Sequence, residues 1–289
     1  MNKLKDWRSL RMRPDGIRVK GRDPMYSLMP YFLTRRYDAM NMITLDIPVA
    51  PLHRYINEKR AEGIRLSHLA LILAAYVRTT AEFPSLNRFI GGNHKIYAHK
   101  ELTVGMVVLR PGRNGDTMSK IKFDFTDDIF RVQEKIDAYI TENRKVEENN
   151  SLDKLMAILL GVPLLAPLLT GILRLLDRFG LLPKVICDIS PFHASLLITN
   201  LASIRTNHIY HHVYEFGTTS VAVAMGNLRE VPKRTKNGIE LERCIPLGVV
   251  MDERICGGHY FAQAFARMKE YLTTPSLLEG PPRYINPEI

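Results

Sequence analysis

A run of histidines offers the clearest proton-transfer chemistry in this chain. His208, His211 and His212 lie in the segment NHIYHHVYEFGTT, and His259 lies further along. An imidazole titrates near pH ~6.5, so its neutral form can take a proton from an attacking hydroxyl, amine or thiol. Each of them is also typical of an exposed or hydrogen-bonded histidine without a catalytic role, and this interpretation stays open.

Metal binding is the second chemistry that the histidine spacing suggests. No cysteine or carboxylate stands at a standard zinc-ligand spacing from these histidines, so we expect no metal site. The cysteines, Cys187, Cys244 and Cys256, form no C-x-x-C pair. Their odd number argues against a disulfide framework and predicts a reducing, cytoplasmic setting.

The composition is that of a folded protein with excess positive charge. Of the 289 residues, 46% are hydrophobic and 24% are charged, which supports a packed core and excludes a largely disordered chain. The net charge of +10 suits nucleic acid, an anionic lipid or a polyanionic cofactor. No nucleic-acid-binding signature accompanies it, so we expect no nucleic-acid partner. Residues 1–20 lack the apolar core of a secretory signal.

Residues 155–173 form a segment without charge that is just long enough to suggest a membrane span. Pro163 and Pro167 interrupt it, and Gly161 and Gly171 weaken it as a helix. We expect two short helices buried in protein. The alternative that stays open is an exposed apolar surface that contacts lipid or a lipophilic substrate.

The elements that must position the histidines mix along the chain without strict strand–helix alternation, which predicts one α+β domain. Strands are expected at 40–49, 95–97, 102–109, 119–125, 194–200, 219–227 and 243–251, and helices at 51–62, 67–82, 127–148 and 258–272. Ser67 is predicted to cap its helix, and 95–97 to pair with 102–109. Residues 1–24 predict a basic arm, 25–280 the domain and 281–289 a tail.

Four segments, taken in order, resemble the catalytic domain of 2-oxoacid dehydrogenase acyltransferases, a relative of chloramphenicol acetyltransferase. They are RLSHLALILAAYVRTTAEFPSLN (65–87), YAHKELTVGMVV (97–108), LLITNLAS (196–203) and IPLGVVMDERICGGHYFAQAF (245–265). Each segment alone is a weak signal, but the ordered set is specific for the fold. The resemblance implies an α/β sandwich, with a mixed sheet flanked by helices, and a homotrimer with sites between subunits.

The resemblance also assigns places in the family's motif, in which a histidine acts as general base and an aspartate follows four residues later. Glu253 stands at the place of that histidine, and Gly257 at the place of the aspartate. Thr199 stands where a hydroxyl donates to the oxyanion. The dehydrogenase branch is matched directly at Asn200, Asp252, Arg254 and Gly258. Arg35 and Arg36 stand where an arginine pairs with the motif's aspartate, which is missing here.

The exchange of histidine for Glu253 leaves two interpretations open. A glutamate with its ordinary pKa is a weak base, whereas burial against apolar surface would raise such a pKa toward neutrality. Glu253 is therefore either a desolvated base or an ionised partner of Arg254 or another arginine. We predict that Glu253 and Thr199 share one pocket, lined by at least one of His211, His212 and His259.

The resemblance implies a freestanding acyltransferase that moves an acyl group between CoA and a small-molecule or lipophilic acceptor. CoA or acyl-CoA is the expected co-substrate, and no lipoyl domain is recognisable ahead of residue 25. The alternative is a family member without turnover that acts as a trimeric binding or scaffold protein.

Overall fold

A mixed seven-stranded sheet forms the centre of the computed structural model, which describes residues 13–20, 24–109, 116–144, 161–236 and 238–286. The strand order is β2-β10-β8-β7-β5-β6, with β9 attached to β10. Only β5–β7 and β7–β8 are parallel pairs among these strands. The bounds are β2 Met40–Pro48, β5 Leu102–Leu109, β6 Asp116–Phe123, β7 Leu196–Asn200, β8 Val221–Met225, β9 Arg229–Thr235 and β10 Gly238–Asp252. The predicted α+β class with a mixed sheet is confirmed.

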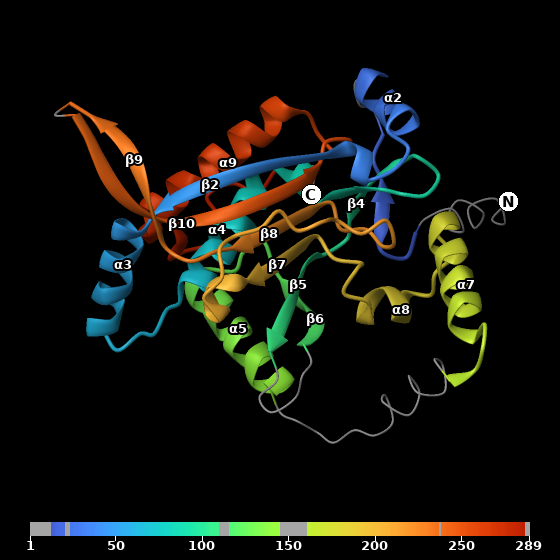
Figure 1. Cartoon of the computed structure of the whole chain (residues 1–289), viewed down its shortest axis with the longest axis horizontal. Helices are drawn as coiled ribbons and strands as arrows, with labels where there is room; N and C mark the ends of the chain where they lie inside the picture. The colour runs from blue at the N-terminus through green and yellow to red at the C-terminus, as the bar shows by residue number, and fades with distance from the viewer. Residues whose placement is uncertain (1–12, 21–23, 110–115, 145–160, 237, 287–289) are drawn as a thin grey trace, which may run out of the picture.

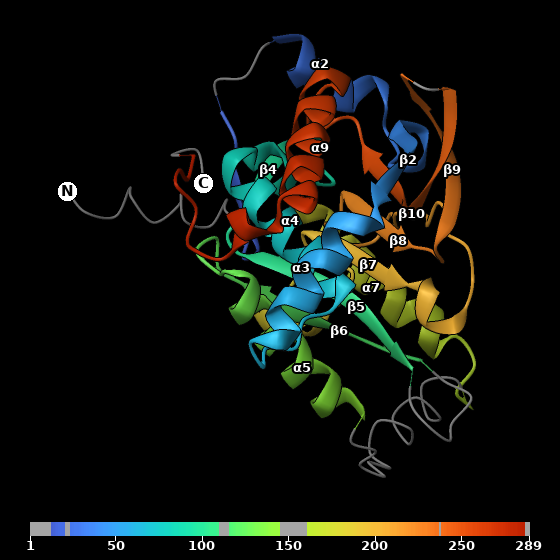
Figure 2. The same cartoon turned by 90° about the vertical axis from the view of Figure 1, so that its left-hand side faces the viewer.

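Helices gather on one face of this sheet (Figure 1 and Figure 2). They are α3 Val49–Ala61, α4 His68–Glu82, α5 Ile129–Arg144 and α9 Gly258–Thr273. Helix α4 is central, and its residues 69–81 are all buried. As predicted, Ser67 caps it, because the Ser67 hydroxyl accepts the Ala70 N–H at 3.1 Å.

The opposite face of the sheet is crossed by the extended segment between β7 and β8. Val213 of this segment packs in a small buried cluster with Leu197 and Val250. A Cβ atom on Gly248 of β10 would lie 2.2 Å from the carbonyl oxygen of Ile209. The glycine therefore lets the segment lie directly on the sheet.

A separate three-stranded sheet overturns one predicted pairing. β4 Ile96–His99 pairs with β1 Gly16–Arg18 on one edge and with β3 Arg88–Ile90 on the other. Both edges of β4 are thus occupied, and β5 joins the main sheet instead. β1 lies in the predicted basic arm, whose residues 13–20 therefore contact the rest of the chain.

Three other elements differ from expectation. α2 Pro24–Phe32 and α8 Lys184–Ile189 are helices that hydrophobic periodicity did not predict. β9 was missed because its side chains are mostly exposed, so they show no apolar alternation. The end of the predicted helix 127–148, over 145–148, lies outside the described residues.

The uncharged segment 155–173 is not buried where the structure describes it. Residues 155–160 lie outside the described range, and α7 Leu165–Phe179 begins shortly after them. Leu164 and Leu168 are 79% and 60% exposed, so the expectation of burial is wrong over 161–173. No helix in the described ranges combines the length and apolarity that crossing a bilayer requires.

Candidate active site

Strand β2 fixes Glu253 at the end of β10. The β2–β10 ladder runs to the pair Asp252–Met40, and the Glu253 N–H donates to the carbonyl oxygen of Ala39 at 2.9 Å. The half-buried Glu253 side chain accepts a hydrogen bond at Oε2 from Nδ2 of Asn41, at 2.7 Å. Its carboxylate is therefore held by β2 and its backbone by Ala39, the residue that precedes β2.

Asp252, rather than Glu253, binds Arg254. The fully buried Asp252 carboxylate accepts from Nε and Nη2 of Arg254 at 2.8 and 2.7 Å. This two-point geometry is the strong form of an arginine–carboxylate pair. Among the described residues, Glu253 makes no ion pair with Arg254, so that pairing is wrong, while a pairing of Glu253 with another arginine stays a prediction.

Arg36 has an aspartate partner after all. Its Nε lies 3.6 Å from Oδ2 of Asp252, and its guanidinium donates to the carbonyl oxygens of Tyr214 and Gly217. Burial lowers the pKa of Arg36, against the attraction of Asp252. The motif's aspartate is missing at position 257, and Asp252 supplies a carboxylate to Arg36 in its stead. Arg35 is exposed and lies over the ring of Tyr37.

The place of the missing motif aspartate is occupied by Tyr26. A Cβ atom on Gly257 would lie 2.2 Å from the hydroxyl oxygen of Tyr26, which belongs to α2. Gly258, the first residue of α9, has no atom near the position of its Cβ. A side chain at position 257 would therefore collide with Tyr26 of α2, whereas a side chain at position 258 would meet no atom.

Two hollows are lined by direct neighbours of Glu253, although Glu253 itself lines neither. The apolar cleft, about 450 Å³, lies between β2 and α9 and includes Asn41, the partner of Glu253. The arginine pocket, about 430 Å³, includes Arg254, the next residue along the chain. The apolar cleft is lined by Asn41, Met42, Ile43, Leu45, Met251, Gly258, Phe261, Ala262, Phe265, Ala266 and Lys269. The cations of the arginine pocket are Arg13, Arg35, Arg36, Arg174, Arg178 and Arg254.

Thr199 lies far from Glu253 within one chain. The ladders place Thr199 in one row with Ala224, Gly248 and Thr44 across β7, β8, β10 and β2. Glu253 follows Gly248 by five residues, which is about 16 Å along a strand. The two side chains therefore share no pocket in one chain, and a pocket shared between subunits stays a prediction.

Asn200 ends the same strand and has a structural bond. Its Oδ1 accepts the Ser203 N–H at 3.3 Å, which caps the short helix Leu201–Ile204. The amide is thus used locally, next to the half-buried Thr199.

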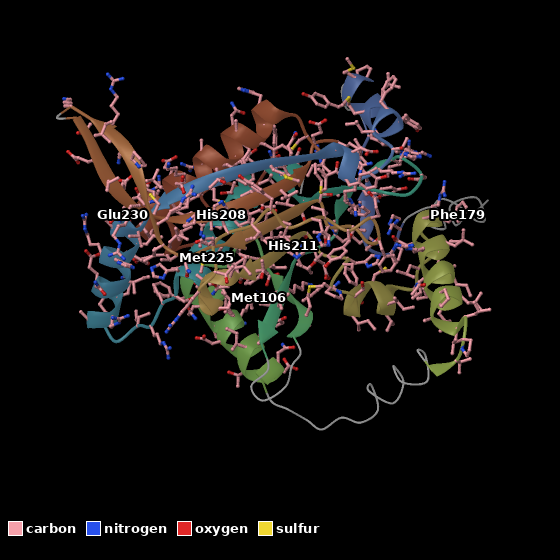
Figure 3. The ribbon with its side chains drawn as sticks, viewed as in Figure 1. Met106, Phe179, His208, His211, Met225 and Glu230 are labelled. Atoms are coloured by element: carbon pink, nitrogen blue, oxygen red, sulfur yellow. The ribbon has the colours of Figure 1, made fainter. Side chains whose placement is uncertain are left out.

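The candidate histidines come from two places: the segment between β7 and β8, where Figure 3 labels His208 and His211, and the first turn of α9. The rings of His211 and His212 stack with centroids 4.7 Å apart, on the sheet face opposite the helices, and His259 is exposed in the first turn of α9. None of the three lines the apolar cleft or the arginine pocket as the described residues form them.

His208, which the sequence did not single out from its neighbours, lies over the row of Thr199. Its Nε2 is 3.1 Å from Oγ1 of Thr44, and burial lowers the pKa of His208. The available signal was Gly248, because a glycine within a strand pattern marks a close approach of another segment.

A buried cluster of possible metal ligands is already bonded to protein groups. Asp15, Cys187 and His193 place ligand atoms within 4.8 Å of one another. Arg13 donates to Asp15 at 3.0 Å, and Nε2 of His193 lies 3.3 Å from Asp177. Burial raises the pKa of Cys187 to about 12, so this thiol is protonated. This donor set does not fit a metal ion.

Comparison with known proteins identifies the fold. A scan against protein-family models finds no match, and a search of curated proteins finds none either. Solved structures do match. A probable dihydrolipoamide acetyltransferase from Listeria monocytogenes aligns with a TM-score of 0.56 and 14% identity, over 95% of this chain and 93% of that one.

Two further structures support the same assignment. A dihydrolipoamide acetyltransferase of Azotobacter vinelandii, studied for the catalytic role of a serine, a histidine and an asparagine, aligns with a TM-score of 0.57 and 14% identity, over 90% of this chain and 94% of that one. Chloramphenicol acetyltransferase aligns with a TM-score of 0.52 and 10% identity, over 89% and 99%. The predicted resemblance is therefore confirmed at the level of the fold.

Proposed function

We propose that this chain, which has the fold of dihydrolipoamide and chloramphenicol acetyltransferases, is an acyltransferase that uses acyl-CoA. The observation that carries the proposal is the position of Glu253. Its carboxylate accepts a hydrogen bond from Asn41, which lines the apolar cleft, and the next residue along the chain, Arg254, lines the arginine pocket.

The two hollows correspond to the two ends of an acyl-CoA molecule. An acyl chain is stabilised by leaving water for the apolar side chains of β2 and α9. CoA phosphates are stabilised by guanidinium groups, which bind phosphate oxygens in a planar fork. Arg35 is exposed at the arginine pocket and is therefore the first candidate for such a contact. The thioester would then lie near Glu253.

The chemistry assigned to Glu253 is proton transfer. Its Oε2 is held by Asn41, which leaves Oε1 to take the proton of an acceptor hydroxyl, amine or thiol. The acceptor then attacks the thioester carbonyl, and the carbon–sulfur bond breaks as the tetrahedral intermediate collapses. The proton on Glu253 goes to the leaving CoA thiolate. The hydroxyl of Thr199 donates to the oxyanion, supplied by a neighbouring subunit of a homotrimer.

A second candidate function is binding without turnover. None of the three histidines predicted for the site, His211, His212 and His259, lines either hollow as the described residues form them, so none of these imidazoles stands beside Glu253 as a base. In this case the protein holds an acyl-CoA or a lipophilic ligand as a trimeric scaffold. The three cysteines are buried and form no disulfide, which supports a reducing compartment such as the cytoplasm for either function.

The test combines binding and turnover. Thermal shifts with CoA and acyl-CoAs of increasing chain length should rise with chain length, because ligands that bind the native state stabilise it. Release of CoA thiol with a panel of acceptors should fall roughly 10²–10⁴-fold in Glu253→Gln. Glu230→Gln, at an exposed position on β9, is the matched control and should leave the rate unchanged.

The outcomes separate the two functions. Clear acyl-CoA binding without turnover in the wild type favours the binding protein. Equal rates in wild type and Glu253→Gln remove Glu253 as the base and direct attention to His208. No thermal shift with any acyl-CoA contradicts both candidate functions.

A further inference from the structure

Helix α7 turns its polar side toward the protein. Asp177 is the one buried residue of this helix. Its carboxylate accepts hydrogen bonds from Arg13, from Nε2 of His193 at 3.3 Å and from the Gly217 N–H at 3.2 Å. Arg13 also donates to the Asp177 carbonyl oxygen at 2.8 Å. The helix is therefore attached to the molecule by polar bonds.

The opposite side of α7 is apolar and exposed. Leu168, Ile172, Leu175 and Phe179 are 60%, 44%, 57% and 66% exposed. Their spacing of four, three and four residues puts them on one stripe, which we call the α7 face. Figure 3 shows Phe179 at the far end of the molecule from Glu230 on β9. A surface helix of a globular protein normally buries such a stripe, so this orientation is inverted.

Cations accompany the α7 face without acidic partners. Arg174 and Arg178 are exposed on the same helix and form no ion pair with any residue in the described ranges. Helix α8 follows with Val185 and Ile189, each 71% exposed. Its Asp188 already pairs with Lys184, at 2.8 Å. The surface thus combines exposed hydrocarbon with positive charge that nothing described neutralises.

We propose that the α7 face rests on an anionic membrane surface. An interfacial helix buries an apolar stripe at the boundary of headgroups and acyl chains, while flanking arginines contact anionic headgroups. No described helix can cross the bilayer, so the contact is with one surface. A symmetric contact with the α7 face of a second copy is disfavoured, because it would bring Arg174 and Arg178 against the same cations, and the mass in solution tests any other contact between copies. This proposal is independent of acyl transfer.

The test is co-sedimentation with vesicles of phosphatidylcholine alone or mixed with phosphatidylserine. The full-length protein should bind the mixed vesicles, and added salt should weaken the binding. The triple variant Ile172→Gln, Leu175→Gln, Phe179→Gln should show no binding to vesicles of either composition. The pair Arg174→Gln, Arg178→Gln should weaken binding to mixed vesicles roughly thirty-fold, since each cation contributes about a factor of five to six at such a surface.

A matched control uses exposed apolar residues elsewhere. Ile239→Gln, Leu241→Gln removes side chains that are 78% and 63% exposed on β10 and should leave binding unchanged. The proposal is overturned if the wild-type protein does not bind the mixed vesicles. It is also overturned if the variant Ile239→Gln, Leu241→Gln lowers vesicle binding as much as the triple variant of α7. It is also overturned if the triple variant lowers the mass in solution without affecting vesicle binding, which assigns the α7 face to a second copy.

The arginines line the arginine pocket as well, so acyl-CoA binding is measured on the same variants. If the arginine pair lowers the acyl-CoA thermal shift and leaves vesicle binding unchanged, their membrane role is overturned while the proposed enzyme function stands. If the arginine pair lowers vesicle binding, the membrane proposal is supported whatever the outcome for acyl-CoA.

Discussion

The side-chain space at Gly257 is the sharpest constraint at the scale of single residues. Tyr26 reaches this space from α2, and its hydroxyl oxygen lies 2.2 Å from where a Cβ would stand. The motif's aspartate therefore cannot be restored without moving Tyr26. The glycine at position 257, in place of the motif's aspartate, is therefore what allows α2 to lie where it does.

We expect Gly257→Ala to lower the free energy of unfolding by about 1–3 kcal/mol, the usual range for an added methyl group in filled space. Urea denaturation measures it. The control Gly258→Ala has open space at the first position of α9 and should be neutral or stabilising by up to about 1 kcal/mol. Tyr26→Ala should relieve most of the penalty when combined with Gly257→Ala. Equal stability of the two single variants would contradict this account.

At the scale of elements, α7 depends on one carboxylate. Asp177→Ala removes the partner of the buried Arg13 and His193. We expect a loss of about 3–5 kcal/mol, because a buried charge is left unpaired. Since the bonds join α7 to the rest of the molecule, the loss should show as faster amide exchange over 165–179.

The comparison for α7 is Asp188→Ala on the neighbouring α8. Asp188 is exposed and pairs only with the exposed Lys184. Such pairs contribute about 0–1 kcal/mol, so amide exchange over 165–179 should be unchanged. Uniform protection of α7 in both variants would show that Asp177 does not hold the helix.

His99 on β4 of the three-stranded sheet makes the stability of the fold depend on pH. Burial lowers the pKa of His99 to about 4, against the attraction of Asp15. The unfolded chain takes up this proton near pH ~6.5, so stability is present above that pH and is lost as pH falls toward about 4. The full shift corresponds to about 3 kcal/mol, but His99 is only half-buried by surface area, so we expect about 1–2 kcal/mol.

The measurement is unfolding free energy against pH for wild type and His99→Gln. The variant should show a flatter slope between about pH 4 and 6.5, and His259→Gln, at an exposed position, should keep the wild-type slope. Asp15 and Asp177, whose pKa values are held low by Arg13 and His193 against burial, add a loss only below about pH 4. Parallel curves for wild type and His99→Gln would refute the assignment.

At the scale of the whole molecule, the separation of Thr199 from Glu253 predicts an assembly. If the two act on one thioester, they come from different subunits. Thr199→Ala and Glu253→Gln should each be inactive as pure proteins. Co-expressed subunits should regain about a quarter of the wild-type rate, because a random mixture leaves that fraction of interfaces with both residues intact.

Sedimentation equilibrium supplies the physical check on this complementation. We expect a homotrimer for wild type and for both variants, because neither substitution alters the fold. A monomer at micromolar concentration, or no activity from the mixed subunits of an otherwise active enzyme, would contradict a site shared between subunits.

The sequence by itself determined the elements that carry a periodic apolar pattern and the order of the family-like segments. The cap at Ser67, strands β2 and β10, and helices α4 and α9 followed from local rules of capping and alternation. Glu253 was placed correctly at the end of β10 for the same reason. These features depend on neighbours in the chain, which a sequence displays.

Only the tertiary structure decided which distant groups meet. The pairing of Arg36 with Asp252, the hydroxyl of Tyr26 at Gly257 and the bond from Asn41 to Glu253 join residues far apart in sequence. The sequence of α7 shows an apolar stripe, but it does not show whether that stripe faces the protein or the solvent. Periodicity defines the stripe without saying whether protein covers it. Asp177 decided that direction, since three buried donors satisfy its carboxylate only when the polar side faces inward.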